Sequence, residues 1–378
     1  MPPVPPADPQ PRLAQLDALR GLAALYVVIY HVMAMPDPDL AVPAALLPFV
    51  GMGGSGVALF FVMSAFSLCL TWPRHAASGL PLRSFYLSRL ARIAPLMLAL
   101  LSVMIVKDQF RAVPLRSYEE VVWNYSLLFG LSSQWQPGIV MGSWTIGVEV
   151  LFYAVFPLIA LRLRGLRPQL ALLVSSYLLA LWAKTGLPAG LAHFGAHIGL
   201  LSQLPVFALG CVLFELWQRL RVLPAPRQAL LGAVLLLAGA AGLGALFYGV
   251  LPPIPLVPDG WYLSALFYGL MVLGLLLASN RLLVNRVTCF LGTISYSLYL
   301  VHPFLVSRLY GVFAKFYAAM PEGVAYFACL ALSLALTLPA SWLTYRFIEK
   351  PGIRLGHRLF ARVRARKRAP AGETQNAY

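Results

Sequence analysis

Charged residues are scarce in this chain. Only 11% of its 378 residues are Asp, Glu, Lys or Arg, whereas 60% are hydrophobic. A soluble domain carries about 25% charged residues, so this composition cannot cover a water-facing surface. Most side chains must therefore be solvated by lipid, and the sequence predicts an integral membrane protein.

Three other features are missing, and each argues against a class of protein. Apolar and polar residues do not alternate strictly, which argues against a β-barrel. The four cysteines match no metal-site or disulfide spacing, so we expect no metal centre and treat them as small apolar residues. The N-terminus is polar and rich in proline, and we expect no cleavable signal peptide there.

Ten apolar segments have close to the ~20 residues that a helix needs to cross the hydrocarbon core. They predict an all-α bundle in which a transmembrane domain, 16–350, lies between a cytoplasmic segment, 1–15, and a basic cytoplasmic tail, 351–378. The tail is expected to be disordered at its end. The run VVWNYSLLFGL is too short for an eleventh span, and we expect it to be interfacial or re-entrant. The predicted spans are 17–36, 54–72, 90–106, 143–161, 168–186, 199–217, 228–249, 260–279, 290–311 and 324–346.

The basic residues are distributed unevenly between the two sides of the predicted bundle. With the N-terminus in the cytoplasm, 23 of the 29 Lys and Arg residues fall on the cytoplasmic side and 6 on the other. That division follows the positive-inside rule and predicts that both termini are cytoplasmic. The net charge of +16 therefore indicates membrane orientation and contact with anionic lipid headgroups. Nucleic-acid binding is not expected, because no recognition module accompanies the charge.

Ionisable side chains inside the first span are candidate site residues, because charge at membrane depth is costly and usually faces the bundle interior. Arg20 and His31 are eleven residues apart, which places them on one helix face and ~16 Å apart along the axis. Asp17 lies near the same helix face. Arg20 should lie near the cytoplasmic end and His31 in the outer half of the membrane.

The fourth span carries Glu149 at the depth predicted for His31, with Thr145 and Tyr153 at neighbouring helical positions. A carboxylate and an imidazole at one depth predict an acid/base couple in which the carboxylate orients the ring and balances its charge. A purely structural alternative stays open for each residue. In the one for His31, the ring only hydrogen-bonds a backbone carbonyl. In the one for Glu149, the carboxylate only holds two helices together.

Two further sets of polar residues are candidates. Ser295, Tyr299 and His302 share a face of the ninth span and would line the same cavity, although a kinked structural contact has the same pattern. Arg89 and Arg92 lie at the cytoplasmic start of the third span. Arginines there commonly anchor a helix at the interface, and they also bind phosphate groups.

Seven motifs, in this order between Leu16 and Pro351, resemble the acyltransferase-3 family of multispanning membrane proteins. They are LDALRGLAALYVVIYH, GVALFFVMSAF, FYLSRLARIAP, SWTIGVEVLFYAVFP, LPVFALGCVL, ISYSLYLVHPF and YRFIEKP. Two positions depart from the usual pattern. Ala65, after Ser64, stands where glycine is usual, and Thr145 stands where serine is common. Ser64 is a further candidate for the cavity lining.

The resemblance implies a multi-pass cell-membrane acyltransferase that moves an acyl group, often acetyl, from cytoplasmic acyl-CoA to a hydroxyl on the far side. The acceptor would be a surface or secreted carbohydrate, as in polysaccharide O-acetylation. His31 is similar to the family's essential histidine and Arg20 to its paired arginine. Arg89 and Arg92 match the Arg-x-x-Arg element that is expected to help to bind CoA, and Glu149 matches the acidic residue of the fourth span.

The expected chemistry has two forms and the function has two alternatives. His31 either removes the proton of the acceptor hydroxyl or first forms an acyl-histidine. The main alternative is a proton-coupled transporter with His31 and Glu149 as relay groups. A third possibility is an assembly subunit whose polar groups only join helices. Binding of acyl-CoA would distinguish the acyltransferase from the transporter, because a transporter has no reason to bind it. The high content of Ala, Leu, Pro and Arg suits a bacterium, and the inner membrane is therefore the expected location.

Overall fold

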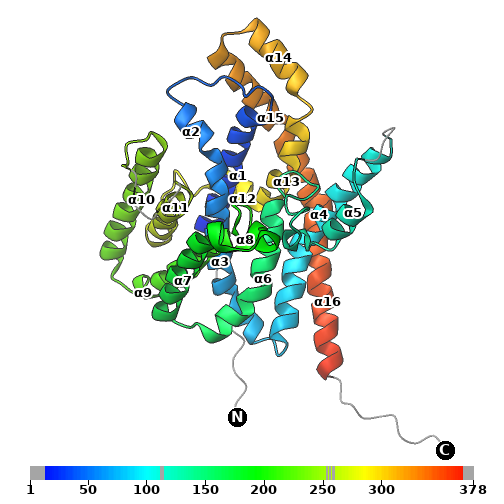
Figure 1. The fold of residues 1–378 in the computed structure, drawn as a ribbon. Helices are drawn as coiled ribbons and strands as arrows, with labels where there is room; N and C mark the ends of the chain where they lie inside the picture. Colours follow the sequence, from blue (N-terminus) through cyan, green and yellow to red (C-terminus); the bar gives the residue numbers. More distant parts are fainter. Residues whose placement is uncertain (1–12, 111–114, 253, 255–256, 258–259, 369–378) are drawn as a thin grey trace, which may run out of the picture.

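A computed structural model describes residues 13–110, 115–252, 254, 257 and 260–368 of the chain. All regular secondary structure within these ranges is helical, and the helices form one bundle (Figure 1). The part of the chain that the structure describes contains nine continuous helical segments that are long and apolar enough to cross a membrane, or up to ten spans if one bent pair is counted. The predicted all-α membrane fold is confirmed.

Nine predicted spans correspond to continuous helices. These are α1 (Ala14–Ala34), α3 (Gly56–Ala76), α4 (Pro81–Gln109), α6 (Trp144–Arg162), α7 (Leu166–Gly186), α9 (Leu200–Leu220), α10 (Ala225–Phe247), α11 (Gly260–Leu277) and α15 (Glu322–Thr344). Helix α15 continues through the π-helical segment η4 (Tyr345–Glu349) into α16 (Lys350–Arg368). Short helices lie between the spans: α2 (Leu47–Gly51), η1 (Gly53–Ser55), α5 (Tyr118–Tyr125), η2 (Phe129–Leu131), η3 (Ala189–Leu191), α8 (Ala192–Gly195) and α14 (Tyr310–Ala319).

The predicted ninth span, 290–311, is not one continuous helix. The chain forms α12 (Arg286–Thr293) and α13 (Ser295–Val306), which meet at an angle of 72°. Helix α12 begins early because the Asn285 side chain caps it, accepting hydrogen bonds from the backbone N–H groups of Val287 and Thr288. Hydropathy alone cannot detect such a break, because both arms are apolar enough to be read as one segment.

The run that is too short for an eleventh span forms α5 and η2. Helix α5 has eight residues, far fewer than a membrane span requires. Ser117 caps its start by accepting a hydrogen bond from the backbone N–H of Glu120. The prediction that this run does not cross the membrane as a helix therefore agrees with the structure.

The basic tail packs on the bundle along part of its length. Helix α16 lies against α4, where Gly352 faces Pro95 and Gly356 faces Ala91. In Figure 1, α16 extends toward the same end of the bundle at which α1 begins. Disorder was predicted only for the end of the tail, and residues 369–378 there lie outside the described residues, as does most of the predicted N-terminal segment, 1–15.

The core lies between α3, α6 and α9, whereas α10 lies at the edge of the bundle (Figure 1). Phe152 of α6 stacks on Phe207 of α9 with ring centroids 4.1 Å apart, and Phe61 of α3 packs on the same ring at 4.6 Å. Lipid is as apolar as these side chains, so close van der Waals packing rather than the hydrophobic effect holds such helices together. The polar residues described below are thereby held on a rigid frame.

A side chain at Gly292 should separate α1 from α12. A Cβ there would overlap the Asp17 carbonyl, and a Cβ at Gly21 would lie 2.5 Å from the Thr288 carbonyl oxygen. Backbone atoms cannot move aside, and overpacking typically costs about 1–3 kcal/mol. Gly292→Val should lower the unfolding temperature in detergent by several degrees. Gly244→Val is the control, because a Cβ at Gly244 meets no atom within 4 Å. Equal unfolding temperatures would contradict the contact.

Candidate active site

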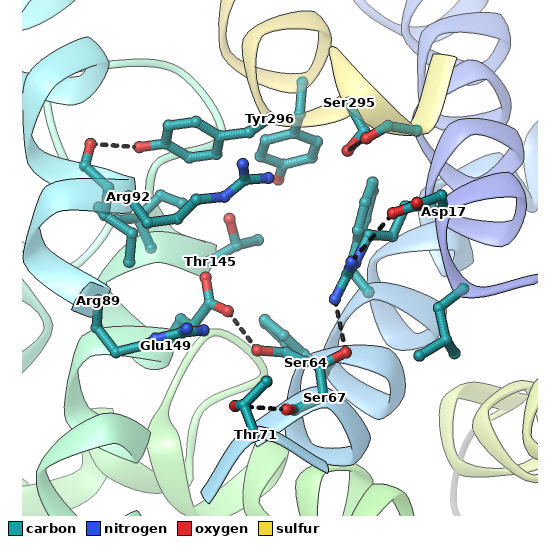
Figure 2. A pocket seen from close by; sticks show the side chains of 18 of the residues that line it. Asp17, Ser64, Ser67, Thr71, Arg89, Arg92, Thr145, Glu149, Ser295 and Tyr296 are labelled. Carbon is teal, nitrogen blue, oxygen red and sulfur yellow. Dashed lines mark hydrogen bonds and ion pairs between the residues drawn. The ribbon is translucent and has the colours of Figure 1, made fainter. Parts of the chain in front are cut away.

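A cavity of about 470 Å³ lies between α1, α3, α4, α6 and the α12–α13 break. Ten of the twelve site residues predicted from the sequence line it, namely Asp17, Arg20, Ser64, Arg89, Arg92, Thr145, Glu149, Tyr153, Ser295 and Tyr299. Figure 2 shows several of these side chains turned toward a common space. Residues from the first and last thirds of the chain therefore meet at one site. His31 and His302 are not among the lining residues.

Four arginines line this cavity: Arg20 on α1, Arg74 on α3, and Arg89 and Arg92 on α4. The guanidinium of Arg20 donates a hydrogen bond of 2.6 Å to the Ser67 hydroxyl. It also lies 3.7 Å from a carboxylate oxygen of Asp17, one turn earlier on α1. The cavity wall therefore carries an excess of positive charge, which favours an anionic ligand.

Arg92 joins the cavity to a buried carboxylate that the sequence analysis missed. Its guanidinium lies 2.7 Å from Glu349 Oε1, and the Ser297 hydroxyl donates to Glu349 Oε2 at 2.8 Å. The side chain of Glu349 is fully buried, whereas that of Arg92 is 35% exposed. Glu349 lies in η4, within the motif YRFIEKP, and the sequence analysis did not single it out as a site residue. An acidic residue at the end of an apolar run was the available signal.

Helix α6 presents one polar face to the cavity. Thr145, Glu149 and Tyr153 are spaced four residues apart, so they lie on the same side of the helix. Ser64 of α3 donates a short hydrogen bond to Glu149 Oε1. The Thr145 hydroxyl donates to the Gly142 carbonyl at 3.0 Å. The hydrogen bond from Ser64 therefore links Glu149 of α6 to α3.

The structure corrects the expected pairing of His31 with Glu149. His31 Nδ1 lies 2.9 Å from Nε2 of His302, and the two ring centroids are 5.0 Å apart. Within the described residues, no hydrogen bond or ion pair joins His31 to Glu149. Equal depth in a membrane does not determine how two helices are rotated about their axes. Glu149 faces Ser64 of α3, whereas His31 faces α13.

The histidine pair lies behind one wall of the cavity. The ring of Tyr299 lines the cavity and lies 6.0 Å from the ring of His302. Its hydroxyl donates to the Gly142 carbonyl at 3.1 Å, and Phe60 packs edge-on against it at 5.8 Å. His302 is fully buried and His31 is half-buried. Tyr299 therefore separates the arginine-lined cavity from His302, which in turn contacts His31.

No cluster of three His, Cys, Asp or Glu side chains suited to a metal ion occurs in the ranges that the structure describes. The cavity instead combines arginines, carboxylates and hydroxyl groups. Such a set can bind an anionic substrate, and the neighbouring histidine pair can transfer a proton. Together with the membrane-spanning bundle, these features define a multi-pass membrane protein with an enzyme-like site.

Comparison with known proteins identifies the family. The acyltransferase domain model of the acyltransferase-3 family matches residues 13–346, so the chain belongs to that family and is an acyltransferase. A protein of Komagataeibacter xylinus, BcsY, whose name describes a membrane-bound transacylase, is 28% identical over 96% of this chain and 88% of its own length. The O-acetyltransferase OatA of Staphylococcus aureus is 24% identical over 92% of this chain. The chain spans only 58% of OatA. No solved structure matches the chain.

The family assignment confirms the resemblance found in the sequence motifs. It favours an enzyme over the transporter and the assembly subunit. The names of the relatives include O-acetyltransferases, which supports transfer of an acyl group to an oxygen atom.

Proposed function

We propose that this protein transfers an acetyl group from acetyl-CoA, bound from the cytoplasmic side, to a hydroxyl of a carbohydrate on the opposite side of a bacterial inner membrane. The observation that carries the proposal is the convergence of four arginines on a cavity whose far wall adjoins the His31–His302 pair. The positive-inside distribution of Lys and Arg supports placing the arginine end in the cytoplasm.

The arginines suit the phosphate groups of acyl-CoA. A guanidinium offers a planar fork of N–H donors that matches phosphate oxygens. Arg20 and Arg92 already contact Asp17 and Glu349, respectively. Arg89 forms no ion pair with a carboxylate among the described residues, and it lies near Glu149 at the same wall of the cavity (Figure 2). Arg89 is therefore better placed than Arg20 or Arg92 to bind a donor phosphate.

The distance along α1 suits a donor that extends across the site. His31 lies eleven residues beyond Arg20, or ~16 Å along the helix axis. With its phosphates at the arginines, the donor would direct its thioester toward Tyr299 and the histidine pair. The acceptor would approach His31, which is half-buried, from the opposite side.

The proposed reaction needs one proton acceptor. His31 takes the proton of the acceptor hydroxyl as its oxygen attacks the thioester carbonyl. The new C–O bond forms, the C–S bond breaks, and the proton passes from His31 to the departing CoA thiolate. Glu149 does not contact His31, so we assign it to the cavity wall, where it lies beside Arg89 and balances part of the arginine charge.

Arg89→Met should weaken acetyl-CoA binding by about 10- to 100-fold, because a hydrogen bond to a charged group contributes roughly 1.5–3 kcal/mol. The measurement is equilibrium binding of acetyl-CoA to purified protein in lipid nanodiscs, beside transfer of radiolabelled acetyl groups to the host glycan fraction. Arg162→Met is the matched control. It removes the same charge from the end of α6, where Arg162 is exposed and does not line the cavity.

Two outcomes would count against the proposed function. If wild-type protein neither binds acetyl-CoA or longer acyl-CoAs nor transfers label, an acyl-CoA donor is ruled out. If Arg89→Met and Arg162→Met weaken binding equally, the effect reflects net charge and the cavity is not the donor site. Label that is recovered in glycan and released by mild alkali would identify an ester on an acceptor hydroxyl.

A further inference from the structure

His302 is held in one orientation by its own helix. Its Nδ1 lies 2.9 Å from the backbone carbonyl oxygen of Leu298, one turn earlier on α13. A carbonyl oxygen can only accept a hydrogen bond, so the proton of the His302 ring must be on Nδ1. The side chain is fully buried, and a positive charge there would be costly. Neutral His302 therefore carries a lone pair on Nε2.

That lone pair determines the proton position in His31. His302 Nε2 lies 2.9 Å from His31 Nδ1, and one of the two nitrogens must donate. Because His302 Nε2 has no proton, His31 Nδ1 is the donor. A neutral His31 then has its lone pair on Nε2, which points away from the pair. The Leu298 carbonyl thus selects the tautomer of His302, and His302 selects that of His31.

We propose that His302 is a positioning residue for His31. This inference rests on the proposed function, in which His31 acts on the acceptor hydroxyl. His302 holds the Nδ1–H form and keeps Nε2 available as the proton acceptor. When Nε2 takes up the proton, the imidazolium donates through Nδ1 to His302, whose ring dipole is fixed by the Leu298 carbonyl.

The pair resembles in outline the base and orienting group of a hydrolase triad, with a neutral imidazole in place of a carboxylate. A neutral partner suits this position, because a buried carboxylate beside a half-buried histidine would require compensation for its charge. Glu149 cannot supply the same function without a change of packing, since its carboxylate is bound to Ser64 on another face of the cavity. His302 itself does not contact substrate in this scheme.

The first test reads the proton position directly in wild-type protein. The chain has six histidines, so ¹⁵N-histidine labelling in nanodiscs gives a small set of ring signals, and loss of one set in His31→Gln assigns His31. We expect the Nδ1–H form at His31. A wild-type His31 with its proton on Nε2, in protein that transfers acyl groups, would overturn the inference and leave the proposed function intact.

The second test separates positioning from folding. His302→Leu removes the acceptor and should lower kcat about 10- to 100-fold with little change in the KM for acetyl-CoA, because the lost hydrogen bond is made to an imidazolium. It should also shift His31 toward the Nε2–H form. His302→Gln returns an acceptor oxygen near the position of Nε2 and should recover most of kcat and of the Nδ1–H signal. His357→Leu, an exposed histidine of α16, is the control.

The outcomes distinguish this inference from the function on which it rests. Equal kcat values for wild type, His302→Leu and His302→Gln would overturn the positioning role while transfer itself continues. Loss of activity in both variants with an unchanged His31 tautomer would overturn it as well, because the effect would then be structural. If wild-type protein binds no acyl-CoA and transfers no acyl group, the proposed function itself is overturned, whichever tautomer His31 adopts.

Discussion

Replacement of His31 with glutamine should lower the rate of acyl transfer by about 10²–10⁴-fold, the usual contribution of a general base. Acetyl-CoA affinity should stay within about twofold of wild type, because His31 is not among the residues that line the arginine cavity. Glutamine can hydrogen-bond His302 but cannot take up the proton. Single-turnover transfer and equilibrium binding, measured on the same nanodisc sample, separate the two effects.

A matched variant controls for any general effect of replacing a histidine. His357→Gln changes an exposed side chain on α16 and should leave both quantities unchanged. If His31→Gln weakens acetyl-CoA binding as much as it slows transfer, then His31 acts in donor binding rather than in chemistry. If transfer is unchanged, His31 is not the proton acceptor, and the base must be sought among the cavity residues.

The transmembrane helices could be predicted from the sequence because the length of an apolar run is a local property. Nine predicted spans match continuous helices, and the arginines of α1 and α4 lie at one cavity as expected. The break between α12 and α13 could not be predicted. Asn285 caps the start of α12 and Gly292 lies close to the backbone of α1, and neither feature changes the hydropathy.

The partner of each polar side chain could not be predicted either. Depth follows from position along a span, so His31 and Glu149 were expected to meet. Rotation about the helix axis is set by packing against neighbours, and it directs His31 to His302 and Glu149 to Ser64. Glu349 was missed because η4 follows the last span, where a charged residue is ordinarily read as solvated.

The Arg92–Glu349 pair should respond very differently to loss of each partner. Arg92→Met leaves a carboxylate whose side chain is fully buried, and breaking a buried pair in this way costs roughly 3–5 kcal/mol. Glu349→Gln leaves an arginine that is 35% exposed at the cavity, where an ion pair is worth at most about 1 kcal/mol. Arg92→Met should therefore be by far the less stable variant. Unfolding by SDS in mixed micelles measures the difference.

The double variant shows whether the cost comes from the uncompensated charge. Arg92→Met combined with Glu349→Leu removes both charges, so it should recover most of the stability that Arg92→Met alone loses. Arg162→Met again provides a control for the loss of one arginine outside the cavity. If the double variant is as unstable as Arg92→Met, the loss comes from packing of the arginine stem rather than from the buried carboxylate. If the two single variants are equally stable, Glu349 is not buried in charged form.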